Sequence, residues 1–122
     1  MAIEGLELAL ACAREADAIQ AEDVKVLDVS GISTLTDYMV VCSGNSMPHL
    51  RAVIRDIEKH ILEEYNSKPA FVDGQGDARW VVLDFIDVMV HVMHEEMREL
   101  YGLEDLWGDA PEVEWQTEAA AE

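Results

Sequence analysis

Residues 79–111 read RWVVLDFIDVMVHVMHEEMRELYGLEDLWGDAP, and they decide the fold of this chain. The apolar runs at 80–85 and 88–93 have the length and β-branched content of strands. Only Ile86 and Asp87 separate the two runs. So short a connection forces neighbouring strands to run antiparallel, so we expect a β-hairpin here.

A helix over residues 95–101 is expected to follow the hairpin. Glu95 and Glu96 would lie at its positive N-terminal end, where carboxylates are stabilised. Gly102 would break or cap the helix. The quoted stretch therefore predicts two strands and a helix in about thirty residues.

The residues before the hairpin predict further helices and strands. Helical spacing of apolar residues and β-branched runs mark a helix at 3–21, strands at 24–29 and 38–43, a helix from about 46 to 65, and a short strand at 70–73. The run 38–43 is apolar almost throughout, which is typical of a central strand buried on both faces. The pattern predicts a mixed α/β domain, with a sheet of about five strands flanked by helices.

The length of 122 residues suits one domain with a single core. We expect this domain to span residues 1–110, and residues 111–122, rich in Glu and Ala, to form a mobile acidic tail. The N-terminus is acidic from residue 4 and lacks the basic segment of a signal peptide. No apolar run is long enough to span a bilayer, so we expect a cytoplasmic protein.

The formal net charge is −18, with only eight Lys and Arg residues. A chain of this charge repels phosphate backbones and anionic lipid, so direct nucleic-acid binding and membrane binding are disfavoured. It is steered towards basic partners, although acidity also serves solubility alone. Cys12 and Cys42 lie in apolar surroundings without Cys-x-x-Cys spacing, which favours buried free thiols.

Two candidate catalytic features are weak. Gly44 and Ser46 lie between a strand and a helix, where a phosphate is sometimes bound, but the pattern is neither a Walker loop nor a dinucleotide fingerprint. Helix capping by Asn45 or Ser46 explains the turn better. Asp84 and Asp87 straddle the hairpin turn and do not form the alternating carboxylate pair that holds metal in nucleotidyltransferases. We expect neither an enzyme nor a cofactor.

His91 and His94 are candidate metal ligands. Their odd spacing in a strand directs their side chains to opposite faces, and no third ligand is evident unless Glu95 serves. A buried, hydrogen-bonded His91 is favoured over a zinc site. We therefore expect no metal.

Aromatic residues beside acids are the remaining signal in residues 79–111. Trp80, Tyr101 and Trp107 are of the types that dominate protein–protein contacts, yet all three also suit a core. The mixture favours a surface that binds a partner over a catalytic site.

Several ordered motifs resemble the Iojap family, also called the RsfS or ribosomal silencing factor family. The motifs are Asp-Val-x-Gly (28–31), Thr-Asp-Tyr (36–38), Gly-Asn-Ser (44–46), Arg-Trp (79–80), Asp-x-x-Asp-Val-x-Val-His (84–91) and Tyr-x-Leu-Glu-x-Leu-Trp-Gly-Asp-Ala (101–110). The resemblance covers about residues 5–111.

The resemblance implies a nucleotidyltransferase-like fold without the catalytic carboxylates. It implies binding to the large ribosomal subunit through its ribosomal protein number fourteen, at the face that meets the small subunit. Bound there, the protein would block subunit association and repress translation when nutrients are scarce. Some relatives act in large-subunit assembly, and some form homodimers when free. Two alternatives therefore stay open, a nucleotide-binding or residual nucleotidyltransferase enzyme and a large-subunit assembly factor.

The binding face implied by the resemblance uses the hairpin and the helix after it. The expected contact residues are Trp80, Asp84, Phe85, Asp87, His94, Glu95, Tyr101, Leu106 and Trp107. Their assignment to contact rather than to core is our own inference.

Overall fold

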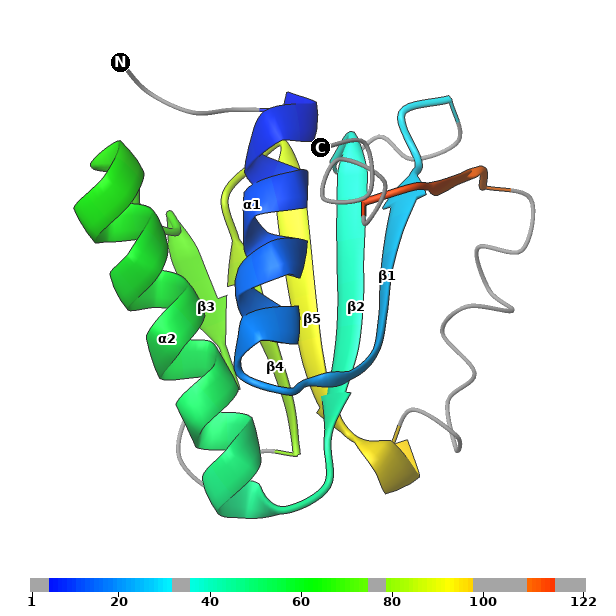
Figure 1. Cartoon of the computed structure of the whole chain (residues 1–122). Coiled ribbons are helices and arrows are strands. Elements are labelled where there is room, and N and C mark those ends of the chain that lie inside the picture. The colour runs from blue at the N-terminus through cyan, green and yellow to red at the C-terminus, as the bar shows by residue number, and fades with distance from the viewer. Residues whose placement is uncertain (1–4, 32–35, 75–78, 98–109, 116–122) are drawn as a thin grey trace.

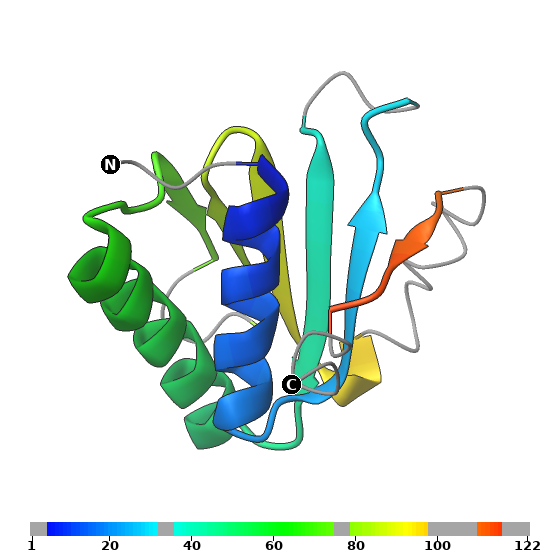
Figure 2. The ribbon, with the colours of Figure 1, turned by 45° about the horizontal axis from the view of Figure 1, so that its top comes forward.

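The computed structural model describes residues 5–31, 36–74, 79–97 and 110–115. Two helices pack side by side on one face of a mixed sheet, as Figures 1 and 2 show from two directions. The elements are α1 (Gly5–Ala18), β1 (Glu22–Asp28), β2 (Tyr38–Gly44), α2 (Met47–Tyr65), β3 (Phe71–Asp73), β4 (Trp80–Asp84), β5 (Val88–His94) and β6 (Glu112–Val113). The predicted mixed α/β fold is confirmed.

The described strands form one six-stranded sheet in the order β3-β4-β5-β2-β1-β6. Strands β2 and β5 pair in parallel, from Tyr38 opposite Val88 to Gly44 opposite His94. The other neighbouring strands are antiparallel, including the predicted β4–β5 hairpin. The chain passes through α2 and β3–β4 before β5, which gives it the length that a parallel pair requires.

The helix-covered face of the sheet holds the main core. Val88, Val90 and Val92 of β5 are fully buried there, because alternate residues of a strand point to the same face. The opposite face carries a second buried cluster, made of Leu27, Val29, Met39, Val41 and Met93. Strand β2 contributes to both clusters, which confirms the prediction that it is buried on both sides.

Helix α2 is capped as its sequence predicts. Ser46 is extended, and its hydroxyl accepts a hydrogen bond from the His49 backbone N–H at 3.2 Å. Pro48 lies in the first turn, where its missing N–H costs nothing. Asn66 ends the helix in the left-handed region, with a φ of 54°. The cap fixes the connection that joins α2 to the end of β2.

The C-terminal segment differs from the expected mobile tail. Glu112–Val113 form β6, with Val113 opposite Val26 of β1. The Trp115 side chain is buried, and its indole Nε1–H donates to the Val24 carbonyl at 3.1 Å. The predicted start of a tail at residue 111 is therefore wrong for residues 112–115, and their pairing gives the sheet its sixth strand. Residues 116–122 lie outside the described residues.

The expected helix after the hairpin is described only at its start. Residues 95–97 are helical, and the remainder of the predicted 95–101 helix lies outside the described residues. None of the described helices is both long enough and apolar enough to cross a bilayer.

Candidate partner-binding site

The β4–β5 hairpin separates the predicted contact residues into two groups. Trp80 lies at the start of β4, beside His94 at the end of β5, whereas Asp84 lies at the end of β4 next to the turn. Five residues of strand hold the two ends about 13 Å apart. The structure therefore does not bring the described candidates together in one patch. We call the two regions the turn end and the open end of the hairpin.

The turn end uses its side chains to hold the fold. Phe85 is only 7% exposed and packs in the main core, because it shares the parity of the buried Val81 and Leu83. The Asp87 carboxylate accepts a hydrogen bond from the Gly5 backbone N–H at the start of α1. Burial of Phe85 contradicts its expected role as a contact residue, and the Asp87 contact gives that carboxylate a structural role.

Asp84 also serves the turn. One oxygen of its carboxylate accepts the Ile86 backbone N–H at 2.8 Å. Ile86 has a φ of 82°, a left-handed conformation that β-branched residues rarely adopt, and its side chain is 57% exposed. The Asp84 hydrogen bond therefore stabilises a left-handed backbone conformation that is unfavourable for isoleucine.

The open end presents Trp80 on the face of the sheet opposite the helices. Its side chain is half-buried and packs against the second cluster. The indole Nε1–H donates to His91 Nδ1 at 3.0 Å, with the two ring centroids 5.9 Å apart. This hydrogen bond to the neighbouring strand fixes the orientation of the indole.

His91 is held neutral beneath this indole. The residue is 7% exposed, and burial lowers the pKa of its imidazole to about 4. Its Nδ1 accepts from Trp80, which assigns the proton to Nε2. The buried, hydrogen-bonded His91 predicted from sequence is confirmed. No group of three His, Cys, Asp or Glu side chains in the described part of the chain is arranged to hold a metal ion.

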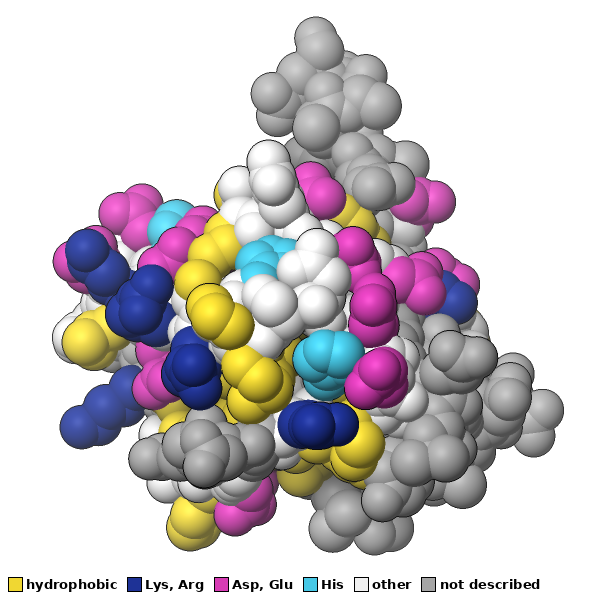
Figure 3. All heavy atoms as spheres, turned by 90° about the horizontal axis from the view of Figure 1, so that it is seen from below, with side chains coloured by type: hydrophobic (Ala, Val, Ile, Leu, Met, Phe, Trp, Pro, Cys, Tyr) yellow, Lys and Arg dark blue, Asp and Glu magenta, His cyan; other side chains and the backbone are white. Residues whose placement is uncertain are grey.

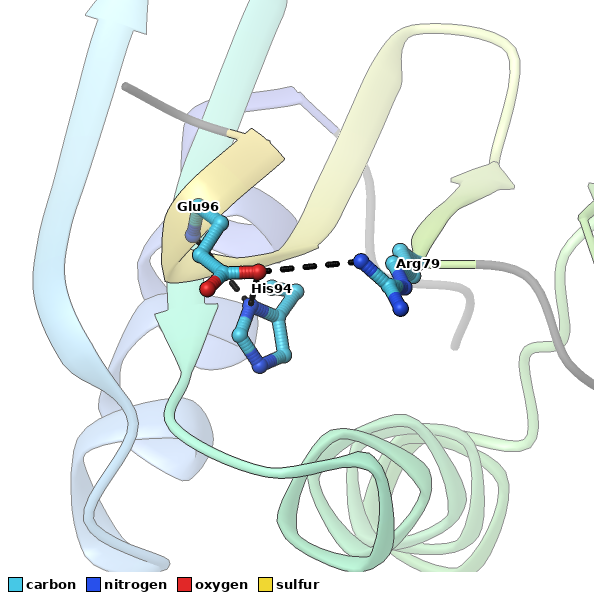
Figure 4. A network of polar contacts seen from close by, with 3 residues as sticks. All are labelled: Arg79, His94 and Glu96. Atoms are coloured by element: carbon cyan, nitrogen blue, oxygen red, sulfur yellow. Dashed lines mark hydrogen bonds and ion pairs between the residues drawn. The ribbon is translucent and has the colours of Figure 1, made fainter. Parts of the chain in front are cut away.

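The rim of the open end is a network of polar side chains, made of Arg79, His94 and Glu96 (Figure 4). Arg79 Nη1 lies 3.6 Å from Glu96 Oε1, and the Glu96 backbone N–H donates to His94 Nδ1 at 3.2 Å. The same carboxylate oxygen lies 3.9 Å from His94 Nδ1, an ion pair only when the imidazole is protonated. The His94 backbone N–H donates to the Arg79 carbonyl at 2.7 Å. Backbone pairing of β4 with β5 thus positions this rim.

These residues form a surface that we call the open-end patch: Arg79, Trp80, His94, Glu95 and Glu96. The side chains of Arg79 and Glu96 are 59% and 70% exposed, so both are available to a partner. Figure 3, which views the molecule from below, shows acidic, basic and histidine side chains beside apolar ones on this face. Sequence reasoning did not select Arg79 and Glu96, although both adjoin residues that it did select.

Three of the predicted contact residues cannot be placed. Tyr101, Leu106 and Trp107 lie outside the described residues. Their roles stay predictions.

The turn from Gly44 to Ser46 is explained by helix packing. A Cβ atom at Gly44 would lie 3.2 Å from the backbone of Leu50, a tight contact that favours glycine. The Asn45 N–H donates to His49 Nδ1 at 3.3 Å, and the Ser46 hydroxyl caps α2. These contacts account for the small residues of the turn without a bound phosphate.

Comparison with solved structures shows the same fold elsewhere. A crystal structure of a Chromobacterium violaceum protein superposes with a TM-score of 0.80 at 29% identity, covering 87% of this chain and 88% of that one. A crystal structure of a Bacillus halodurans protein superposes with a TM-score of 0.76 at 35% identity, covering 90% of this chain and 99% of that one.

Comparison with known sequences gives the family. The model of the family described as "Ribosomal silencing factor during starvation" matches residues 2–122. The ribosomal silencing factor RsfS of Bacillus subtilis is 45% identical over 92 residues, which cover 75% of this chain and 77% of that protein. The chloroplastic protein Iojap of Arabidopsis thaliana is 32% identical over 114 residues, 91% of this chain and 46% of that protein. The chain therefore belongs to the ribosomal silencing factor family.

Proposed function

We propose that this protein binds the large ribosomal subunit through its ribosomal protein number fourteen and thereby prevents the small subunit from joining. The observation that carries this proposal is the family match over residues 2–122. The mechanism is occlusion, in which a folded domain occupies space that the small subunit needs. Such a mechanism requires a docking surface and no catalytic group.

The open-end patch is the proposed docking surface. Trp80 offers apolar area on a side chain whose orientation is already fixed by His91, so little conformational freedom is lost when a partner covers it. Glu95 and Glu96 lie beside it and are exposed. An aromatic anchor within a polar rim is the usual composition of a contact centre.

Charge supports a basic partner. The chain carries a net charge of −18, and a protein bound to ribosomal RNA is expected to be basic. Attraction between the two would speed their encounter and weaken with added salt. An interface of standard size would bury about 800 Å² on this chain. We place this action in the cytoplasm.

A homodimer of the free protein would regulate this action if the dimer contact included the open-end patch. Dissociation would then have to precede docking. The concentration of free monomer would set the fraction of occupied subunits.

A binding assay with the purified ribosomal protein number fourteen tests the docking surface. Trp80→Ala is expected to weaken binding about 30-fold, a loss of about 2 kcal/mol typical of a central aromatic contact. Phe71→Ala is the matched control, because Phe71 is a 62% exposed aromatic residue on the edge strand β3. Both variants are first checked for a folded thermal transition. Equal affinities of the two variants would exclude Trp80 as the anchor.

A role in large-subunit assembly is the second candidate. The mouse protein named "Mitochondrial assembly of ribosomal large subunit protein 1" is 35% identical over 91 residues, 71% of this chain and 39% of that protein. Removal of the protein from cells separates the two roles. Accumulation of large-subunit precursors would favour assembly, whereas a normal precursor content with excess joined ribosomes in starved cells would favour silencing.

A further inference from the structure

A groove of about 670 Å³ runs between α2 and the β3–β4 strands, and none of its lining residues belongs to the open-end patch. Its apolar lining comes from α2 and from the facing strands, and consists of Leu50, Ile54, Leu62, Val72 and Val81. Within this lining the Leu62 side chain is 47% exposed. The groove therefore presents apolar surface that the described part of the fold leaves uncovered.

Cations concentrate along this groove. Four of the eight Lys and Arg residues of the chain line it, namely Arg51, Arg55, Lys59 and Lys68. None of these four forms an ion pair with another described residue. Figure 3 shows dark-blue side chains around yellow ones on the side of the molecule where α2 runs. A basic strip on a chain of net charge −18 is a local exception to its overall charge.

The spacing of these cations follows the helix. Arg51, Arg55 and Lys59 are four residues apart, so they form one row along α2. Leu50, Ile54 and Leu62 form a parallel apolar row, interrupted by Glu58. Glu58 is the one acidic residue of the lining, and partial burial raises the pKa of its carboxyl. An occupant with acids and apolar side chains in two parallel rows would match both rows.

We propose that this groove binds an amphipathic helical segment of an acidic partner protein, at a second interaction surface beyond the proposed ribosome contact. The remaining surface of the chain is strongly acidic and would repel such a segment, so the basic rim selects both the site and the ligand. The apolar floor favours a protein segment over a nucleic acid, because no aromatic side chain lines the groove to stack on bases.

The residues after Trp115 are a poor fit for this groove. Trp115 is hydrogen-bonded to β1, which lies four strands away from β3 in the sheet. The segment 116–122 contains Gln, Thr, Glu and Ala but no large apolar side chain for the floor. A partner protein is therefore the favoured occupant.

Titration of the full chain with labelled peptides tests the proposal. The probe is a fluorescein-labelled peptide of about 18 Leu and Glu residues, arranged as an amphipathic helix about 27 Å long. One comparison peptide has Lys in place of Glu, and another has Ser in place of Leu. A labelled oligouridylate represents nucleic acid. Fluorescence anisotropy gives the affinities, and amide chemical shifts locate the contact.

The acidic amphipathic peptide is expected to bind, with shifts concentrated in α2 and β3–β4. Arg55→Glu is expected to weaken its binding about fivefold to tenfold, since an attraction becomes a repulsion. Lys25→Glu makes the same change in net charge on β1 and is expected to weaken binding less than about twofold. Thermal unfolding of both variants verifies that they are folded.

Five results would overturn the proposal. The first is no binding of the acidic peptide at a peptide concentration of about 1 mM. The second is equal binding of the Ser-containing peptide, and the third is tighter binding of the oligouridylate. The fourth is equal weakening by Arg55→Glu and Lys25→Glu. Concentration-dependent shifts of the groove amides in the protein alone would assign the surface to a second copy and would also overturn it.

Discussion

The turn end and the open end of the β4–β5 hairpin have similar compositions but different roles. Each has an aromatic residue beside acids, and residues of both ends were expected to bind a partner. At the turn end, Phe85 is buried and Asp87 accepts a hydrogen bond from the start of α1. At the open end, Glu95 and Glu96 are exposed beside a half-buried Trp80. The two aromatic side chains differ because Trp80 and Phe85, five residues apart, point to opposite faces of the sheet.

Phe85→Ala has the largest expected effect and tests the turn end. Removing a buried aromatic side chain from the main core is expected to lower the free energy of unfolding by about 3 kcal/mol or more. Urea denaturation measures this change. Affinity for the large subunit, measured on the folded fraction, is expected to stay within about twofold of wild type. A large loss of affinity with unchanged stability would place Phe85 in the contact instead.

His91→Gln tests how the open end is supported. Because burial lowers the His91 pKa to about 4, the unfolded chain takes up a proton first as the pH falls below about 6.5. The contribution of His91 to stability is therefore fully present above about pH 6.5 and is lost as the pH falls towards 4.

Between pH 7 and pH 5 the wild type is expected to lose about 2 kcal/mol more than His91→Gln. Urea denaturation at both pH values measures this difference, and glutamine keeps an oxygen acceptor for the Trp80 indole. The loss of unfolding free energy that both proteins share between these pH values comes from their many carboxylates. Parallel losses in the two proteins would mean that His91 is not buried neutral.

Glu95→Lys tests the charge of the open end. The side chain is exposed, so the free energy of unfolding is expected to change by less than about 0.5 kcal/mol. Affinity for a basic partner is expected to fall about fivefold, with most of the change in the association rate and a weaker dependence on salt. Glu63→Lys on the exposed side of α2 is the matched control. Equal effects of both variants would indicate general steering without a local contact.

Ile86→Gly has the smallest expected effect. Relief of the left-handed φ of 82° favours glycine by about 1 kcal/mol, whereas the greater backbone freedom of glycine when unfolded opposes it by a similar amount. A net change in the free energy of unfolding within about 0.5 kcal/mol is expected, well below the usual loss for an aliphatic residue. Thermal unfolding measures it. A loss above about 2 kcal/mol would mean that the Ile86 side chain supports the turn through packing.

Local sequence signals predicted the elements that depend on neighbouring residues. The two-residue connection predicted the hairpin, and Ser46 with Pro48 predicted the start of α2. Both predictions were possible because turns and caps are made by residues close together in the chain. Burial of Phe85 could also have been predicted from the sequence, because Val81, Leu83 and Phe85 are alternate residues and so point to the same face. The aromatic and acidic composition of the stretch obscured that alternation.

Pairing between strands that are far apart in the chain could not be predicted from the sequence. Strand β6 has only two residues and pairs with β1 from the far end of the chain, and its neighbouring glutamates resembled a solvated tail. Val113 and Trp115 alternate with these acids, which is the pattern of an edge strand with one buried face. The contact between Trp80 and His91 likewise depends on the register between β4 and β5, which no local pattern specifies.

Sedimentation of ribosomal subunits tests whether the protein blocks subunit joining through Trp80. Purified small and large subunits are mixed at a magnesium concentration that allows joining, with wild-type protein, with Trp80→Ala or with Phe71→Ala. Wild type and Phe71→Ala are expected to leave the subunits separate and to sediment with the large subunit, whereas Trp80→Ala is expected to allow joined ribosomes to form. Unchanged joining in the presence of excess wild-type protein would contradict this expectation.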